Sequence, residues 1–220
     1  MHQPFLVGVN TNSPHDREIP DGAGAIFGIS NSLQKHQSVL RFSEQAMREF
    51  FEKVERKPYY KNTIFVLMSD HTHDKHNSIA AKYFIPGVIF SEDLVPAKTV
   101  DRYVSQRDFS PTIMEILGLP ASPVFTGKSF WSDREGVYFS DYFDSGSVGW
   151  LNGDLLVETN VNDSSVLKCF SIANGLLNAS LVDCDEHHKN SSIKSLVFTS
   201  YSQDLLFKGK TKIFYDLFNE

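Results

Sequence analysis

The stretch Asn62-Thr-Ile-Phe-Val-Leu-Met-Ser-Asp-His-Thr72 carries the strongest fold signal in the sequence. Its residues 63–68 form a continuous β-prone apolar run, which is typical of a central strand covered on both faces. The run leads directly into Ser69, Asp70 and His71. Because α/β proteins usually bind ligands beyond the carboxyl ends of buried strands, this stretch predicts a strand with a binding site at its end.

The elements around this strand follow from hydrophobic pattern and from helix signals. Residues 4–10 and 85–90 are short apolar runs that predict two further buried strands. A helix is expected from about Ser38 or Ser43 to Glu55, because apolar residues recur there at helical spacing before Pro58. A second helix is expected to open at Ser110-Pro111, with Gly118 at its C-terminus.

From about residue 137 onward, short apolar runs alternate with Gly, Asn, Asp and Ser, which predicts antiparallel strands and turns. Residues 202–218 are expected to end the chain as a helix or a strand. The predicted fold class is α/β, with a mostly parallel sheet, helices on both faces and a small antiparallel β-rich C-terminal subdomain. The expected division is 1–136 for the α/β part and 137–220 for the β-rich subdomain.

Composition excludes several classes of protein. The chain has 220 residues, of which 41% are hydrophobic, enough for a full core. Acidic residues number 27 and basic residues 21, giving a net charge of −6. Without a cationic field, a nucleic-acid partner is not expected. The longest apolar runs are also far too short to span a bilayer.

The adjacent pair Asp70 and His71 is the main candidate for chemistry. Divalent metals of intermediate hardness accept oxygen and nitrogen ligands together, so both side chains could bind one ion above the sheet edge. The alternative from spacing alone is a capping aspartate beside a solvated histidine. His73 and His76 add imidazoles to the same loop, one facing solvent and the other contacting substrate or supporting a ligand. His15 lies in a separate polar loop and could bind an anionic group if that loop reaches the same edge.

Several segments together resemble a known family. Residues 62–72 are similar to the metal-ligand segment of the sulfatase branch of the alkaline phosphatase superfamily, and most similar to its lipoteichoic acid synthase-like and phosphoglycerol transferase-like proteins. Ser38–Glu52, Tyr83–Phe90, Ser105–Gly118 and Phe125–Ser129 resemble the family's helix, next strand, later helix and closing turn. Order and spacing agree over about residues 5–129, whereas residues 137–220 match only loosely.

The resemblance implies residue roles. Asp70 and His71 would be ligands of a divalent cation, manganese or magnesium rather than calcium or zinc. His15 would be the catalytic, substrate-contacting histidine near the leaving or incoming oxygen, and His76 a further substrate-binding histidine. A cation stabilises charge on the transferring group, and a histidine on the opposite side can protonate the leaving oxygen.

One departure from the family is expected to matter. In the family, the nucleophile and at least one acidic metal ligand lie well upstream of the segment matching His15, so no nucleophile is assigned. The sequence therefore resembles the C-terminal part of a catalytic domain. By itself such a part would lack covalent catalysis and have an incomplete metal site.

The implied activity is metal-dependent phosphoryl or phosphoglycerol transfer, or phosphodiester hydrolysis. The substrate would be an anionic phospholipid head group or a phosphorylated glycan. The alternatives are a sulfate-ester hydrolase and a catalytically inactive sulfatase-like binding module. The resemblance also implies an extracytoplasmic location in the cell envelope, with membrane tethering through segments absent from this chain. In that setting Cys169 and Cys184 could form a disulfide or remain as two buried thiols.

Overall fold

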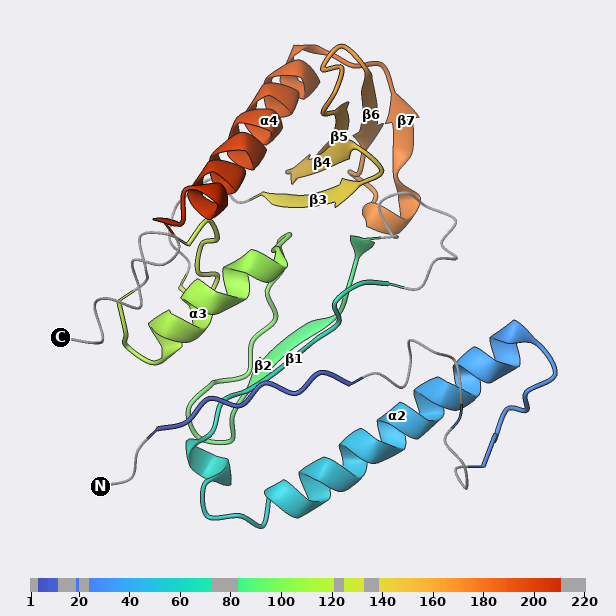
Figure 1. Cartoon of the computed structure of the whole chain (residues 1–220), viewed down its shortest axis with the longest axis vertical. Coiled ribbons are helices and arrows are strands. Elements are labelled where there is room, and N and C mark those ends of the chain that lie inside the picture. Colours follow the sequence, from blue (N-terminus) through green and yellow to red (C-terminus); the bar gives the residue numbers. More distant parts are fainter. Residues whose placement is uncertain are drawn as a thin grey trace. The chain divides into compact units, whose positions relative to one another are not determined.

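The computed structural model describes residues 4–11, 19, 24–72, 83–120, 125–132 and 139–210. The chain divides into two units, Met1–Thr63 with Ser91–Asp93, and Ile64–Phe90 with Leu94–Glu220. The described residues form both helices and strands, so the predicted α/β class is confirmed (Figure 1). None of the described helices is both long and apolar enough to cross a membrane.

The first unit is built on helix α2, Ser32–Val54. The helix starts earlier than predicted because Asn31 caps it, its side chain accepting a hydrogen bond from the Gln34 N–H. Residues 4–10 were predicted as a buried strand, and this is wrong. They form no strand, and Leu6 is 97% exposed. In the described part of the chain, no strand pairs with this apolar run. The composition of a segment does not show whether another strand is available to pair with it.

The second unit contains the predicted strand pair, β1 at Phe65–Met68 and β2 at Gly87–Phe90. The two strands are antiparallel, with Phe65 opposite Phe90. A parallel sheet is therefore not confirmed, because the chain reverses direction between Met68 and Gly87. Val66 and Met68 are 39% and 43% exposed, so the expected burial of β1 on both faces is not seen in the described structure.

Helix α3, Phe109–Ile116, follows a 3₁₀ turn, η3, at Gln106–Asp108. Ser105 caps η3, and Asp108, not the expected Ser110, is the residue at the N-cap position of α3. Gly118 takes the predicted position after the helix, with a φ of +67°. The N–H groups of Gly118 and Leu119 donate to the carbonyls of Glu115 and Met114, which closes the helix end.

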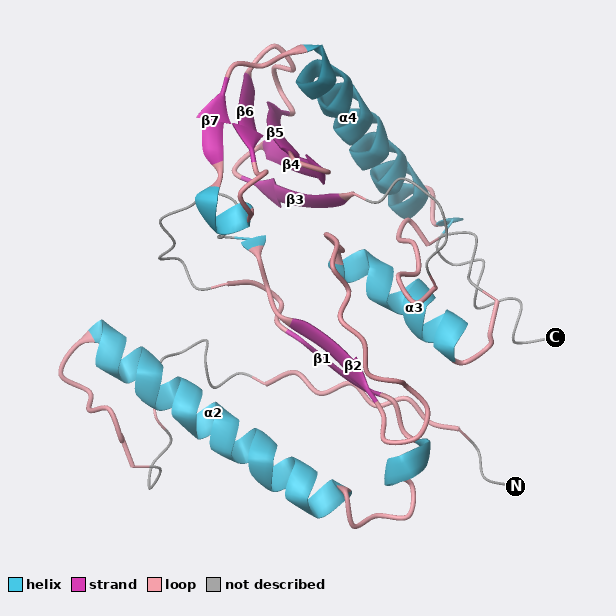
Figure 2. Cartoon of the chain, turned by 180° about the vertical axis from the view of Figure 1, so that it is seen from behind, coloured by secondary structure: helices cyan, strands magenta, loops and turns pink. Residues whose placement is uncertain are grey.

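The C-terminal region forms the predicted antiparallel sheet, in the order β3-β4-β5-β6-β7 (Figures 1 and 2). The strands are Ser140–Asp144, Ser147–Asn152, Leu155–Asn160, Leu167–Ser171 and Ser180–Val182. Helix α4, Glu186–Phe207, packs across β4 and β5. The core has two sides. Leu151, Leu156, Phe170 and Ile172 cluster on one, and Trp150, Val157 and Cys169 on the other.

A disulfide joins Cys169 on β6 to Cys184, just before α4. The sequence left open whether these residues are bonded. The bond closes a loop with a sequence separation of 15 and ties the entry of α4 to the sheet.

Candidate metal centre

The Asp70–His71 pair lies just past the end of β1. The Ser69 N–H donates to the Pro86 carbonyl at 3.4 Å, which extends the β1–β2 pairing by one step. Beyond this bond Asp70 and His71 are no longer part of the ladder, and their side chains are exposed to solvent, by 86% and 68%. The strand thus presents both side chains at its open end.

The two side chains face each other. His71 Nε2 lies 3.6 Å from Asp70 Oδ2. Two ligands that are each about 2.0–2.2 Å from one ion lie roughly 3–3.5 Å from each other. The observed separation therefore needs only a small rotation for both atoms to bind the same cation.

The tautomer of His71 is also favourable for metal binding. Its Nδ1 lies 2.8 Å from the Thr72 carbonyl oxygen, which can only accept a hydrogen bond. Nδ1 therefore carries the proton, and the lone pair of neutral imidazole is on Nε2, the atom that faces Asp70. Metal-bound histidines usually have this arrangement, with the second nitrogen held by a carbonyl or carboxylate.

Gln106, which was not singled out from the sequence, fixes the backbone of the pair. Its Nε2 donates to the carbonyls of Ser69 at 2.9 Å and of Asp70 at 3.1 Å. Gln106 itself is held by a capping box, in which Ser105 and Asp108 cap each other's backbone. Its place in the matched segment 105–118 was the available signal, but a glutamine in a capping turn has no distinctive pattern.

The other matched segments support this turn. The Asp108 carboxylate accepts from the Lys128 N–H at 2.9 Å, and the Thr112 hydroxyl accepts from the Phe130 N–H at 3.0 Å. At Gly127 a Cβ would lie 2.1 Å from the Arg107 carbonyl oxygen, so the backbones approach too closely for any side chain. Segments 105–118 and 125–129 are therefore one interlocked structural unit.

Arg107 is part of this unit and is not an anion-binding group. Its side chain is only 17% exposed, so the charge is buried rather than solvated. Its guanidinium lies 4.5 Å and 4.8 Å from the ring centroids of Phe139 and Phe198 and forms an ion pair with Asp141. Burial lowers the pKa of Arg107 from its usual value. The charge thus stabilises packing among η3, β3 and α4.

The remaining predicted site residues, His15 and His76, lie outside the described residues, as does His73. Within the described ranges, no group of three or more His, Cys, Asp or Glu side chains could hold a metal ion. The structure brings Asp70 and His71 together, and the roles of all four residues, Asp70, His71, His15 and His76, stay predictions.

Comparison with known proteins shows the family of the chain. A family model described as Sulfatase matches residues 2–119. The chain belongs to the sulfatase family. It is 23% identical over 178 residues to a lipoteichoic acid synthase of Staphylococcus saprophyticus, a match that covers 71% of this chain and 24% of the relative.

Solved structures show the fold of this sulfatase-family chain. A protein of the alkaline phosphatase superfamily from Vibrio parahaemolyticus matches with a TM-score of 0.70 and 21% identity over 88% of this chain and 48% of its own. The lipoteichoic acid synthase LtaP from Listeria monocytogenes matches with a TM-score of 0.68 and 14% identity over 88% and 52%. The chain thus spans about half of these solved chains and a quarter of the curated relative.

The residues present fit a divalent cation of the kind that members of this superfamily typically use. A carboxylate oxygen and an imidazole nitrogen of suitable tautomer face each other at a solvent-open strand end. Two donors are only part of a coordination shell, so any further His, Cys, Asp or Glu ligand must come from outside the described residues.

Proposed function

We propose that the complete protein is a metal-dependent enzyme that transfers a phosphoryl or phosphoglycerol group, or hydrolyses a phosphodiester. The facing pair Asp70 Oδ2 and His71 Nε2 carries this proposal, together with membership of the sulfatase family and similarity to lipoteichoic acid synthases. The substrate class we propose is an anionic phospholipid head group or a phosphorylated glycan.

The chain's own residues have defined parts in this proposal. Asp70 and His71 hold the cation, for which we propose manganese or magnesium. Thr72 keeps the proton on His71 Nδ1, and Gln106 holds the backbone of the pair. The bound cation would stabilise negative charge on the oxygens of the transferring group. We assign His15 to the departing or incoming oxygen and His76 to substrate contact, and we assign no nucleophile within this chain.

We also propose an extracytoplasmic location, in the cell envelope, with the complete protein tethered to the membrane. The Cys169–Cys184 disulfide supports this, because such bonds persist in oxidising compartments.

The test is turnover by the complete protein with Mn²⁺, using a phosphoglycerol-headed phospholipid, bis(p-nitrophenyl) phosphate and p-nitrophenyl sulfate as substrates. We expect hydrolysis or transfer with the phosphodiesters. Asp70→Ala and His71→Ala should each lower the rate by about a hundredfold or more, because each removes a ligand. The exposed residue Asp101 provides a matched control, and Asp101→Ala should leave the rate unchanged.

Other outcomes contradict the proposal in distinguishable ways. Full activity and metal content in both variants would remove the site assignment. Turnover of the sulfate ester alone would establish a sulfate-ester hydrolase. No turnover of any substrate, with full metal content, would leave a sulfatase-like binding module.

A further inference from the structure

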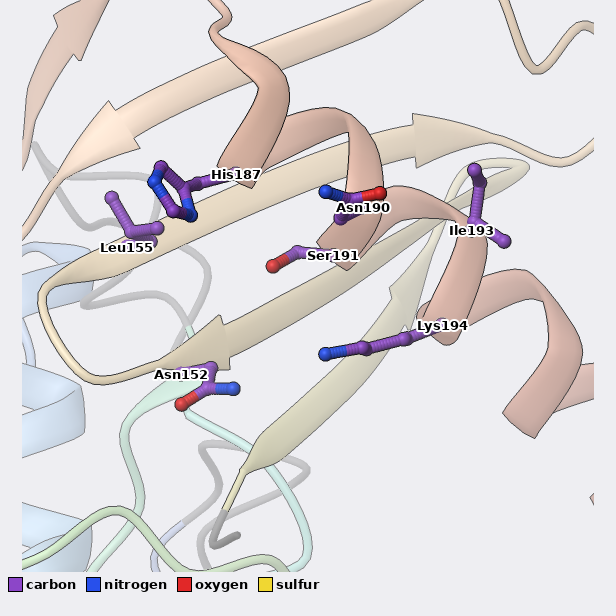
Figure 3. Close-up of a pocket in the computed structure, with 7 residues that line it drawn as sticks. All are labelled: Asn152, Leu155, His187, Asn190, Ser191, Ile193 and Lys194. Carbon is purple, nitrogen blue, oxygen red and sulfur yellow. The ribbon is translucent and has the colours of Figure 1, made fainter.

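A second candidate site lies in the C-terminal region, between the first half of α4 and the end of the β4–β5 hairpin. It is a hollow of about 420 Å³ (Figure 3). Seven residues line it: Asn152, Leu155, His187, Asn190, Ser191, Ile193 and Lys194. None of them belongs to the Asp70–His71 centre, so the inference is independent of the proposed function.

The backbone explains why these residues meet. Asn152 and Leu155 are paired across the hairpin and lie two residues beyond Trp150 and Val157, on the face of the sheet that packs against Phe198 of α4. On α4, His187, Asn190, Ser191 and Lys194 have the spacing i, i+3, i+4, i+7, which places them on one side of the helix. The hollow is thus closed on one side by a polar helix stripe and on the other by a hairpin end.

The polar groups that face this space are not engaged elsewhere. Ser191 is only 8% exposed, and its hydroxyl has no hydrogen-bond partner among the described residues. The side chains of Lys194 and Asn152 likewise have none there. Figure 3 shows the Ser191 hydroxyl and the Lys194 ammonium directed into the space above Asn152. The Ser191 hydroxyl, which opens on the hollow and has no partner among the described residues, is therefore available to hydrogen-bond a ligand.

The charge of the lining is positive, although the chain carries a net −6. Among the described residues that line the hollow, Lys194 is the only lysine or arginine, and none is a carboxylate. The acidic side chains at the start of α4 already have hydrogen-bond or ion-pair partners. Asp185 caps the helix and accepts from His188, and Glu186 forms an ion pair with Lys189 at 2.6 Å. The hollow therefore favours an anion over a cation or a neutral sugar.

We propose that this hollow binds a tetrahedral oxyanion carried by a polyol or sugar, that is, a phosphate or sulfate ester. Lys194 supplies the charge-assisted hydrogen bond, and Ser191, Asn190 and Asn152 supply neutral donors around it. The volume is within the range of small-molecule sites and leaves room for a polyol beyond the oxyanion.

The experiment is titration of the ¹⁵N-labelled full chain, followed by amide shifts, with sn-glycerol 3-phosphate, glucosamine 6-sulfate, inorganic phosphate and glycerol. We expect saturable shifts confined to residues 152–155 and 187–194 with the two esters and none with glycerol. If the esters bind more tightly than inorganic phosphate, the hollow recognises the ester as a whole. If they bind equally, it recognises only the oxyanion. Both outcomes support anion recognition.

Lys194→Gln should weaken ester binding by about tenfold, as expected for loss of one charge-assisted hydrogen bond. Lys189→Gln is the matched control, since Lys189 lies on the same helix but already pairs with Glu186, and it should bind normally. The proposal is overturned if millimolar ester shifts none of these amides, if glycerol shifts them equally, or if the two lysine variants bind alike. Both lysines are exposed, so neither substitution threatens the fold.

Discussion

Gln106 has no catalytic chemistry, but it fixes the backbone of the proposed metal-ligand pair. Its side-chain amide, in the η3 turn, donates hydrogen bonds to the carbonyls of Ser69 and Asp70. These bonds fix the backbone position from which the Asp70 side chain extends. Without this amide, the backbone at the end of β1 loses these two hydrogen bonds.

We therefore expect Gln106→Leu to weaken Mn²⁺ binding by the complete protein by about tenfold, the lower range for residues that orient metal ligands. Binding is measured by calorimetry, with thermal unfolding as the check on the fold. Gln45→Leu serves as the control, because Gln45 hydrogen-bonds only to Glu49 on the surface of α2. Equal affinity in the Gln106 and Gln45 variants would show that Gln106 does not position the site.

Asp185 makes the stability of α4 depend on pH. The N–H of His188 donates to its carboxylate at 3.0 Å, and this bond holds the pKa of Asp185 below its usual value. A depressed pKa in the folded state means that the stabilisation is present above the unfolded-state pKa of about 3.9 and is lost as pH falls through the folded value.

Asp185→Asn keeps a capping side chain but cannot titrate, so it should flatten the acid limb of the stability curve. The measurement is thermal unfolding of both proteins between about pH 2 and pH 6. Parallel curves for the two proteins over this range would contradict the role of Asp185.

At the scale of elements, the apolar pattern located β1 and α2, predicted a strand at residues 4–10 that does not form, and missed the first part of α4. The apolar run before Asp70 correctly indicated β1, and Pro58 correctly marked the region where α2 ends. Helix α4 was expected only from residue 202, because its buried face carries Ser191, Ser192 and Ser195 and so lacks apolar periodicity. Asp185, three residues before His188, was the signal that could have located its start.

The position of Asp70 and His71 at a strand end was predictable because it depends on local features of the sequence, and their role as metal ligands stays a prediction. Gln106 and the α4 hollow were not predictable, since each depends on segments brought together by the fold. The spacing of His187, Asn190, Ser191 and Lys194 was visible, but its meaning required knowing which hairpin end lies opposite it.

The disulfide should account for a substantial part of the stability of the C-terminal sheet and α4. Replacing both cysteines, Cys169→Ala with Cys184→Ala, should lower the free energy of unfolding by about 3 kcal/mol, the chain-entropy value for a loop of this length. Denaturant unfolding measures the change, with reduced wild-type protein as the matched comparison. Two titratable thiols in the unreduced wild-type protein would contradict the bond.

At the scale of the whole molecule, the fold is that of the alkaline phosphatase superfamily, although the chain spans only about half of the solved chains it matches. The segments that resemble the family have two separate structural roles. Residues 105–118 and 125–129 form an interlocked support, and this support holds the backbone of Asp70, one of the two proposed metal ligands at the end of β1.

The central claim is that Asp70 and His71 bind one cation together. The most direct measurement is the anomalous scattering of Mn²⁺ in crystals of the complete protein. The account predicts one peak within about 2.0–2.2 Å of both an Asp70 carboxylate oxygen and His71 Nε2. A bound Mn²⁺ whose coordination shell includes neither side chain would contradict it.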